Sequence, residues 1–161
     1  MKAMLARLFG RGEPMLSEAT ARDTAAIAAL HGASFRRGWS DLEIERLLLD
    51  RNIVAHRATS GRSLHGFILS RLAAGEAEIL SVAVAEARRG RGLARSLLNL
   101  HLRRLAGLGV QAVFLEVDED NEPARRLYQR AGFREVGRRP GYYQQGRDHA
   151  ATALVLRRDL V

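Results

Sequence analysis

The chain has 161 residues and a formal net charge of +8, which comes almost entirely from arginine because Lys2 is its single lysine. It contains no cysteine, so disulfides, thiolate nucleophiles and cysteine-ligated zinc sites are excluded. Apolar residues make up 47% of the chain and charged residues 27%, which is typical of a globular domain. No apolar run approaches the ~20 residues needed to span a membrane, and the five histidines lack metal-ligand spacing, so we expect neither a membrane segment nor a metal.

The length fits one domain over residues 14–161, preceded by a basic extension at 1–13. The apolar stretches of this extension are too short for a signal-peptide core, so we expect a cytoplasmic location. The positive charge favours anionic partners such as a nucleotide cofactor, RNA or a ribonucleoprotein surface, although it is equally consistent with a solvated arginine-rich face. No strand carries the paired aromatics of an RNA reader, so we expect no direct nucleic-acid binding. The oligomeric state is left open.

In the first half of the chain, Ser40 is a good N-cap and Glu43 completes a capping box. Glycine and serine mark two hairpin turns, at 60–63 and 73–76. The expected elements in chain order are a strand at 15–20, a helix at 21–34, a helix at 41–50, and strands at 52–59 and 64–72.

The stretch 77–98 joins a strand, a turn and a helix. Its apolar run at 79–85 indicates a buried strand, and the helical spacing of leucines over 93–105 indicates a helix. Between them lies a turn rich in arginine and glycine, at 88–92. Because the first N–H groups of a helix are unpaired and its dipole is positive there, this arrangement predicts an anion site suited to a phosphate-bearing cofactor.

The second half completes an α+β fold. Its expected elements are a strand at 111–117, a helix at 122–131, a strand at 133–138, a polar loop at 140–149 and a strand at 150–156. The helix over 93–105 joins the strands before and after it, which implies that those two strands are parallel, whereas the hairpins imply antiparallel pairs. No G-x-G-x-x-G turn follows the first strand, which argues against a dinucleotide-binding fold.

Residues 89–94, Arg-Gly-Arg-Gly-Leu-Ala, fit the [Q/R]-x-x-G-x-[G/A] signature, and the chain resembles the GNAT acetyltransferase superfamily. Further residues resemble its ribosomal-protein alanine N-acetyltransferases over about residues 14–158: Trp39-Ser40, Leu115-Glu116-Val117, Asn121 with Tyr128, and Arg138-Arg139 with Tyr142-Tyr143. This resemblance implies a mixed, mostly antiparallel sheet with splayed parallel central strands flanked by helices. It also implies transfer of the acetyl group of acetyl-CoA to a protein N-terminal amine, with a ribosomal protein as the expected acceptor.

The resemblance also implies a cofactor site. The pyrophosphate would rest on the signature turn and the pantetheine arm would pair with the strand before it. A backbone N–H near Val84 would polarise the thioester carbonyl. Asn121 matches a cofactor contact, and is also read as the N-cap of the helix that follows. The cofactor-binding residues implied are Val82, Ala83, Val84, Arg89, Gly90, Arg91, Gly92, Leu93, Ala94 and Asn121.

The reaction needs a base, because an α-ammonium with a pKa of about 8 must lose a proton before it attacks. Glu116, within the apolar run at 113–117, is the first candidate, since a carboxylate there is costly to bury without a task. Glu78, early on the preceding strand, is the rival base, or a solvated strand end. The resemblance makes Tyr128 the acid that protonates the leaving thiolate; the alternative is core packing.

Aromatic residues beside these positions are expected to form a substrate wall: Trp39, Tyr142 and Tyr143. For Trp39, hydrophobic anchoring is an equal alternative. An acidic turn at 118–120 replaces the arginine that often follows Leu-Glu-Val in the family, which leaves the acceptor preference open. The alternatives to a protein N-terminus are a lysine side chain or small-molecule amine on the same scaffold, and a non-catalytic ribosome- or RNA-binding module.

Overall fold

The computed structural model describes residues 12–143 and 151–161, with the side chains of Tyr142 and Tyr143 outside the described set. Within this part, one sheet of seven strands has the order β1-β2-β3-β4-β5-β7-β6. The strands are β1 Met15–Glu18, β2 Ile53–Ser60, β3 Ser63–Ala73, β4 Glu76–Val84, β5 Ala112–Asp118, β6 Arg134–Tyr143 and β7 Ala151–Asp159. The helices are α2 Thr24–Ser34, α3 Asp41–Leu49, α4 Leu93–Gly107 and α5 Glu122–Arg130, with 3₁₀ turns η1 Ala21–Asp23 and η2 Glu86–Arg88. The expected α+β order of elements is confirmed.

Local signals explain where several elements begin. Ser40 Oγ accepts from the backbone N–H of Glu43 at 3.2 Å, and the Glu43 carboxylate accepts from the N–H of Ser40 at 2.7 Å, so the capping box opens α3 as expected. The turn between β3 and β4 places Ala74 at φ 50° and Gly75 at φ 80°. Positive φ at both central residues is the geometry of a tight two-residue hairpin.

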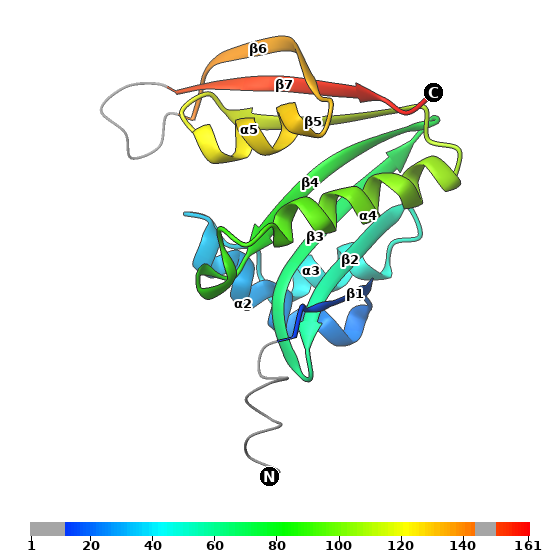
Figure 1. Ribbon diagram of the computed structural model, residues 1–161, viewed down its shortest axis with the longest axis vertical. Helices are drawn as coiled ribbons and strands as arrows, with labels where there is room; N and C mark the ends of the chain where they lie inside the picture. Colours follow the sequence, from blue (N-terminus) through cyan, green and yellow to red (C-terminus); the bar gives the residue numbers. More distant parts are fainter. Residues whose placement is uncertain (1–11, 144–150) are drawn as a thin grey trace.

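Two hydrophobic clusters lie on opposite faces of the sheet because side chains alternate along each strand. On β3, Ile68 belongs to the cluster under α4, whereas Phe67 and Leu69 belong to the cluster under α2 and α3. The first cluster also takes Tyr128 from α5. Helices α4 and α5 therefore cover one face, and α2 and α3 cover the other face of β2–β4 (Figure 1).

The parallel strands β4 and β5 pair over a short stretch and then diverge (Figure 1). Their register joins Glu76–Glu78 to Ala112–Phe114, and the strands run parallel because α4 connects them as a crossover. Beyond that point, the register between β3 and β4 shifts, so that Leu80 has no partner across the strand pair. A bulge of this kind bends a strand. The expected splayed parallel centre is confirmed.

Three expected boundaries are wrong: β1 ends at Glu18, β7 runs to Asp159, and β6 continues into the expected loop. The sequence predicts a polar loop over 140–149, but Pro140–Tyr143 continues β6. Proline removes a backbone donor, and this is tolerated because β6 lies at the edge of the sheet. The register with β7 moves from Arg139↔Ala153 to Tyr143↔Ala151, so the residues around Pro140 form a bulged segment. Residues 144–149 of the expected loop, and residues 1–11 of the expected extension, lie outside the described residues.

Candidate active site

The start of α4 presents an open helix N-terminus. Gly92 is its N-cap, with φ 80°, and makes no side-chain capping bond because it has no side chain. Gly90 also has a positive φ, 75°, and a Cβ built at either glycine would meet nothing within 4 Å. No acidic residue stands in the first turn. Unpaired N–H groups, a positive dipole and free space in front of them are what a phosphate group requires.

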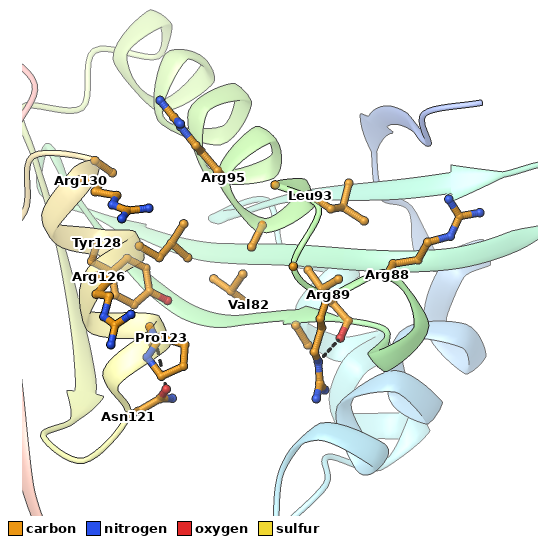
Figure 2. A pocket seen from close by; sticks show the side chains of 18 of the residues that line it. Val82, Arg88, Arg89, Leu93, Arg95, Asn121, Pro123, Arg126, Tyr128 and Arg130 are labelled. Carbon is orange, nitrogen blue, oxygen red and sulfur yellow. Dashed lines mark hydrogen bonds between the residues drawn. The ribbon is translucent and has the colours of Figure 1, made fainter. Parts of the chain in front are cut away.

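This turn opens onto a cavity of about 770 Å³ between β4, the start of α4 and α5. Figure 2 shows side chains from these three elements directed around one space. Five arginines contribute to its lining: Arg88, Arg89, Arg95, Arg126 and Arg130. Guanidinium groups suit phosphate because they are always charged and donate two bonds at once. An open helix N-terminus ringed by arginines therefore fits the pyrophosphate and phosphate groups of acetyl-CoA.

The edge of β4 that faces this cavity is not paired with β5. The N–H of Ala85 donates to His65 O at 2.8 Å, toward β3. Because successive N–H groups of a strand point to opposite edges, the N–H of Val84 points to the edge from which β5 has diverged. The Val84 carbonyl points the same way, and Arg89 Nε donates to it at 3.0 Å. The signature arginine thus ties the turn to β4, and the adjacent N–H faces the position expected for the thioester.

Helix α5 supplies the opposite wall. Asn121 is its N-cap, with Oδ1 accepting from the N–H of Ala124 at 3.3 Å, and it also lines the cavity. Both roles considered from the sequence are therefore compatible. Tyr128 is 8% exposed and packs edge-on against Phe133. Its hydroxyl points toward β4 in Figure 2. Burial raises the pKa of Tyr128 to about 12, so the phenol is protonated at neutral pH and well above it.

The two candidate bases lie in a second cavity, which shares no lining residue with the first. Val113 and Leu115 of β5 point into the cluster under α4, so Phe114 and Glu116 face the other side of the sheet. Glu78 pairs in register with Phe114 and joins them there. The Glu116 side chain is 21% exposed and bonds Arg139 Nη1 through Oε1 at 3.1 Å, whereas Glu78 is exposed.

The structure brings most of the expected cofactor residues together around the first cavity: Val82, Ala83, Val84, Arg89, Gly90, Gly92, Leu93, Ala94 and Asn121. Arg91 is exposed and does not line it. Trp39 lies elsewhere: its ring stacks on His31 with centroids 4.2 Å apart, against the cluster under α2 and α3. This contact is hydrophobic anchoring, and substrate binding by Trp39 stays a prediction. The side chains of Tyr142 and Tyr143 lie outside the described set.

Sequence reasoning assigned no task to several residues that line the cavities. Arg126 and Arg130 are four positions apart on α5, so they share a face, and this helical spacing could have identified them. Phe35, which begins the segment 35–39 that the sequence also predicts to form part of the substrate wall, lines the first cavity. Arg139 was noted within the family resemblance, but its ion pair with Glu116 depends on strand order and had no local signal. Among the described residues, no cluster of histidine and acidic side chains could hold a metal, and no helix is long and apolar enough to cross a membrane.

Comparison with known proteins decides the family. The acetyltransferase (GNAT) family description matches residues 15–133, which is more than half of the chain. The chain belongs to the GNAT acetyltransferase family. A crystal structure of the ribosomal-protein-S18-alanine N-acetyltransferase from Escherichia coli superposes with a TM-score of 0.83 at 23% identity, covering 90% of this chain and 92% of that one. This likeness shows that the GNAT fold is shared.

Curated relatives point in two directions. The N-alpha-acetyltransferase RimI of Mycobacterium tuberculosis is 41% identical over 106 residues, 63% of each chain. The [ribosomal protein bS18]-alanine N-acetyltransferase of Haemophilus influenzae is 36% identical over 88 residues, 53% of this chain and 60% of that one. A mycothiol acetyltransferase of Mycobacteroides abscessus is 46% identical over 59 residues, 37% of this chain and 20% of that one. The chain thus spans less than two thirds of the length of these relatives.

Proposed function

We propose that this GNAT protein transfers the acetyl group of acetyl-CoA to the α-amino group of a protein N-terminus, with a ribosomal protein as the acceptor. One observation carries the proposal: beside the gap where β4 and β5 diverge, an open, arginine-lined cavity extends from α4 and α5 to the end of α2, and a separate cavity bears carboxylates on the face of the sheet away from α4. A phosphate-bearing donor and a cationic acceptor can therefore occupy separate cavities beside one gap. An acceptor made on the ribosome agrees with the expected cytoplasmic location.

Acetyl-CoA supplies an acetyl group already activated as a thioester. Glu116 accepts the proton that the acceptor ammonium must lose, directly or through a water. The backbone N–H of Val84 stabilises the oxyanion that develops when the neutral amine attacks. Tyr128, whose phenol is protonated at neutral pH, gives its proton to the departing sulfur. Glu116 is preferred to Glu78 as the base because it is more enclosed, and electrostatic interactions are stronger away from water.

A small-molecule amine is the second candidate acceptor, and the similarity to mycothiol acetyltransferases favours it. Four acceptors separate the possibilities: a peptide with a free N-terminal alanine, the same peptide N-acetylated, the N-acetylated peptide with an internal lysine, and a small-molecule primary amine. Thiol release from acetyl-CoA is followed, and the product is located by mass spectrometry. Release with the free N-terminus alone is expected. Release with the small-molecule amine alone would replace the proposal, and no release with any amine would favour a non-catalytic binding module.

The assignment of the base is tested with two matched variants. Glu116→Gln should lower kcat on the free peptide by about 10²–10³-fold, the usual contribution of a general base, while acetyl-CoA affinity stays within about twofold. Glu78→Gln should lower kcat less than about threefold, because Glu78 is solvent-exposed. A dead Glu78→Gln beside an active Glu116→Gln would reverse the two roles.

A further inference from the structure

The candidate base has a cationic partner from a distant strand. Arg139 Nη1 lies 3.1 Å from Glu116 Oε1, although the two residues come from β6 and β5, with β7 between them. Val155 of β7 pairs with both Glu116 and Gly137, so the Arg139 side chain spans the width of β7 to reach the carboxylate. Both Arg139 and Glu116 line the second cavity.

The neighbouring arginine shows that this contact is selective. Arg138, one position earlier and also exposed, turns to Glu135 and to Glu119 at 3.6 Å. Alternation along β6 sends the two guanidinium groups to different carboxylates. Arg139 begins the bulged segment of β6, where the register with β7 shifts. The charged residues that face Glu116 across the cavity are Arg71, Glu76, Glu78 and Arg139.

This placement bears on the acceptor amine. An ammonium ion that enters the second cavity is attracted to the carboxylate of Glu116, but Arg139 already forms an ion pair with one oxygen of that carboxylate. A like charge a few ångströms away disfavours the charged form of an amine and favours the neutral form. Arg139 therefore opposes tight binding of the ammonium and promotes the neutral amine, which is the species that attacks a thioester.

We propose that Arg139 is a positioning residue that orients Glu116 and shifts the bound acceptor toward its neutral, nucleophilic form. The proposal rests on the proposed function, since it takes Glu116 as the base and an N-terminal amine as the acceptor. It goes further by assigning to Arg139, in the second cavity, an effect that lowers the affinity for the acceptor and raises kcat.

The kinetic test is Arg139→Ala with the free N-terminal alanine peptide. If the neighbouring charge lowers the pKa of the bound ammonium by one unit from about 8, removing it reduces the neutral fraction at pH 7 about fivefold, so kcat should fall about fivefold. The KM for the peptide should fall about threefold, because in the variant the ammonium pairs with Glu116 without competition from Arg139. A fall of both kcat and KM indicates that the substitution removed an interaction that destabilised the bound substrate. Arg139→Lys, which keeps the charge, should recover most of kcat. Arg138→Ala is the matched control and should leave both constants unchanged.

A binding test works without turnover. Calorimetry with CoA-saturated protein compares the free peptide with its N-acetylated form. Arg139→Ala should bind the free peptide about threefold more tightly than the unchanged protein does, and the acetylated peptide equally well. Weaker binding of both peptides by Arg139→Ala, or a raised KM, would overturn the proposal and make Arg139 a substrate contact. If the unchanged protein binds the free peptide but does not acetylate it, the proposed function fails, and the ratio of the dissociation constants of the unchanged protein and Arg139→Ala still tests the role of Arg139. If neither the unchanged protein nor Arg139→Ala binds the free peptide, both proposals fail.

Discussion

Replacing Gly92 by aspartate tests whether the start of α4 receives phosphate. A side chain at this position meets nothing within 4 Å and enters the open space before the helix. The left-handed backbone, φ 80°, strains any substitute, but aspartate and asparagine tolerate this region better than most residues. Gly92→Asn therefore shares the strain and shape of Gly92→Asp, and the two variants differ by one negative charge.

The magnitude follows from Coulomb's law. One pair of like unit charges about 5 Å apart at an effective dielectric constant of about 20 repels by about 3 kcal/mol. Gly92 is exposed, so screening by water and salt should reduce this to about 1.4 kcal/mol, a tenfold loss of affinity. Gly92→Asp should thus bind acetyl-CoA about tenfold more weakly than Gly92→Asn.

Isothermal titration calorimetry with acetyl-CoA measures this difference, and repeating it in about 1 M salt, where the Debye length is about 3 Å, should shrink the gap. Urea unfolding provides the control, since the free energies of unfolding of the two variants should agree within about 0.5 kcal/mol. Equal dissociation constants for Gly92→Asp and Gly92→Asn at low salt would refute a phosphate at the start of α4.

Two further predictions concern buried titratable groups. Tyr128→Phe should lower kcat about 10²-fold by removing the general acid. Because burial raises the pKa of Tyr128 to about 12, its contribution to stability is complete below pH 10 and is lost as pH rises toward 12. Over that range, the free energy of unfolding measured with urea should fall by about 2–3 kcal/mol in the unchanged protein and by less in Tyr128→Phe. His101 bonds Ser70 Oγ at 2.6 Å and His56 Nδ1 at 2.7 Å, and burial followed by the charge of His56 lowers its pKa to about 3. Its contribution is therefore present above pH 6.5 and lost as pH falls toward 3. At pH 8, His101→Leu should lower the free energy of unfolding by about 1–3 kcal/mol, because Ser70 and His56 each lose a hydrogen bond. Between pH 6.5 and 4, the free energy of unfolding of this variant should fall less than that of the unchanged protein. An equal fall in both proteins would mean that other groups cause the acid dependence.

Local signals predicted much of this fold because each acts over a few residues. Ser40 and Glu43 specify a helix start through bonds made within one turn. The turn at Ala74-Gly75 and the glycines before α4 likewise mark conformations that neighbouring residues determine. The end of β6 was missed because proline usually ends a strand, and only the edge position of β6 makes Pro140 acceptable there.

The candidate site divides along the same line. The sequence by itself determined the strand, the glycine turn and the start of α4 where we propose that phosphate binds, since these three parts are contiguous in the chain. It also placed Glu116 and Tyr128 on their elements. Only the tertiary structure decided that Tyr128 and the two carboxylates line different cavities, and that Arg139 holds Glu116. Those facts depend on which face each strand turns to a helix and on β7 lying between β5 and β6, and no short stretch of sequence encodes either.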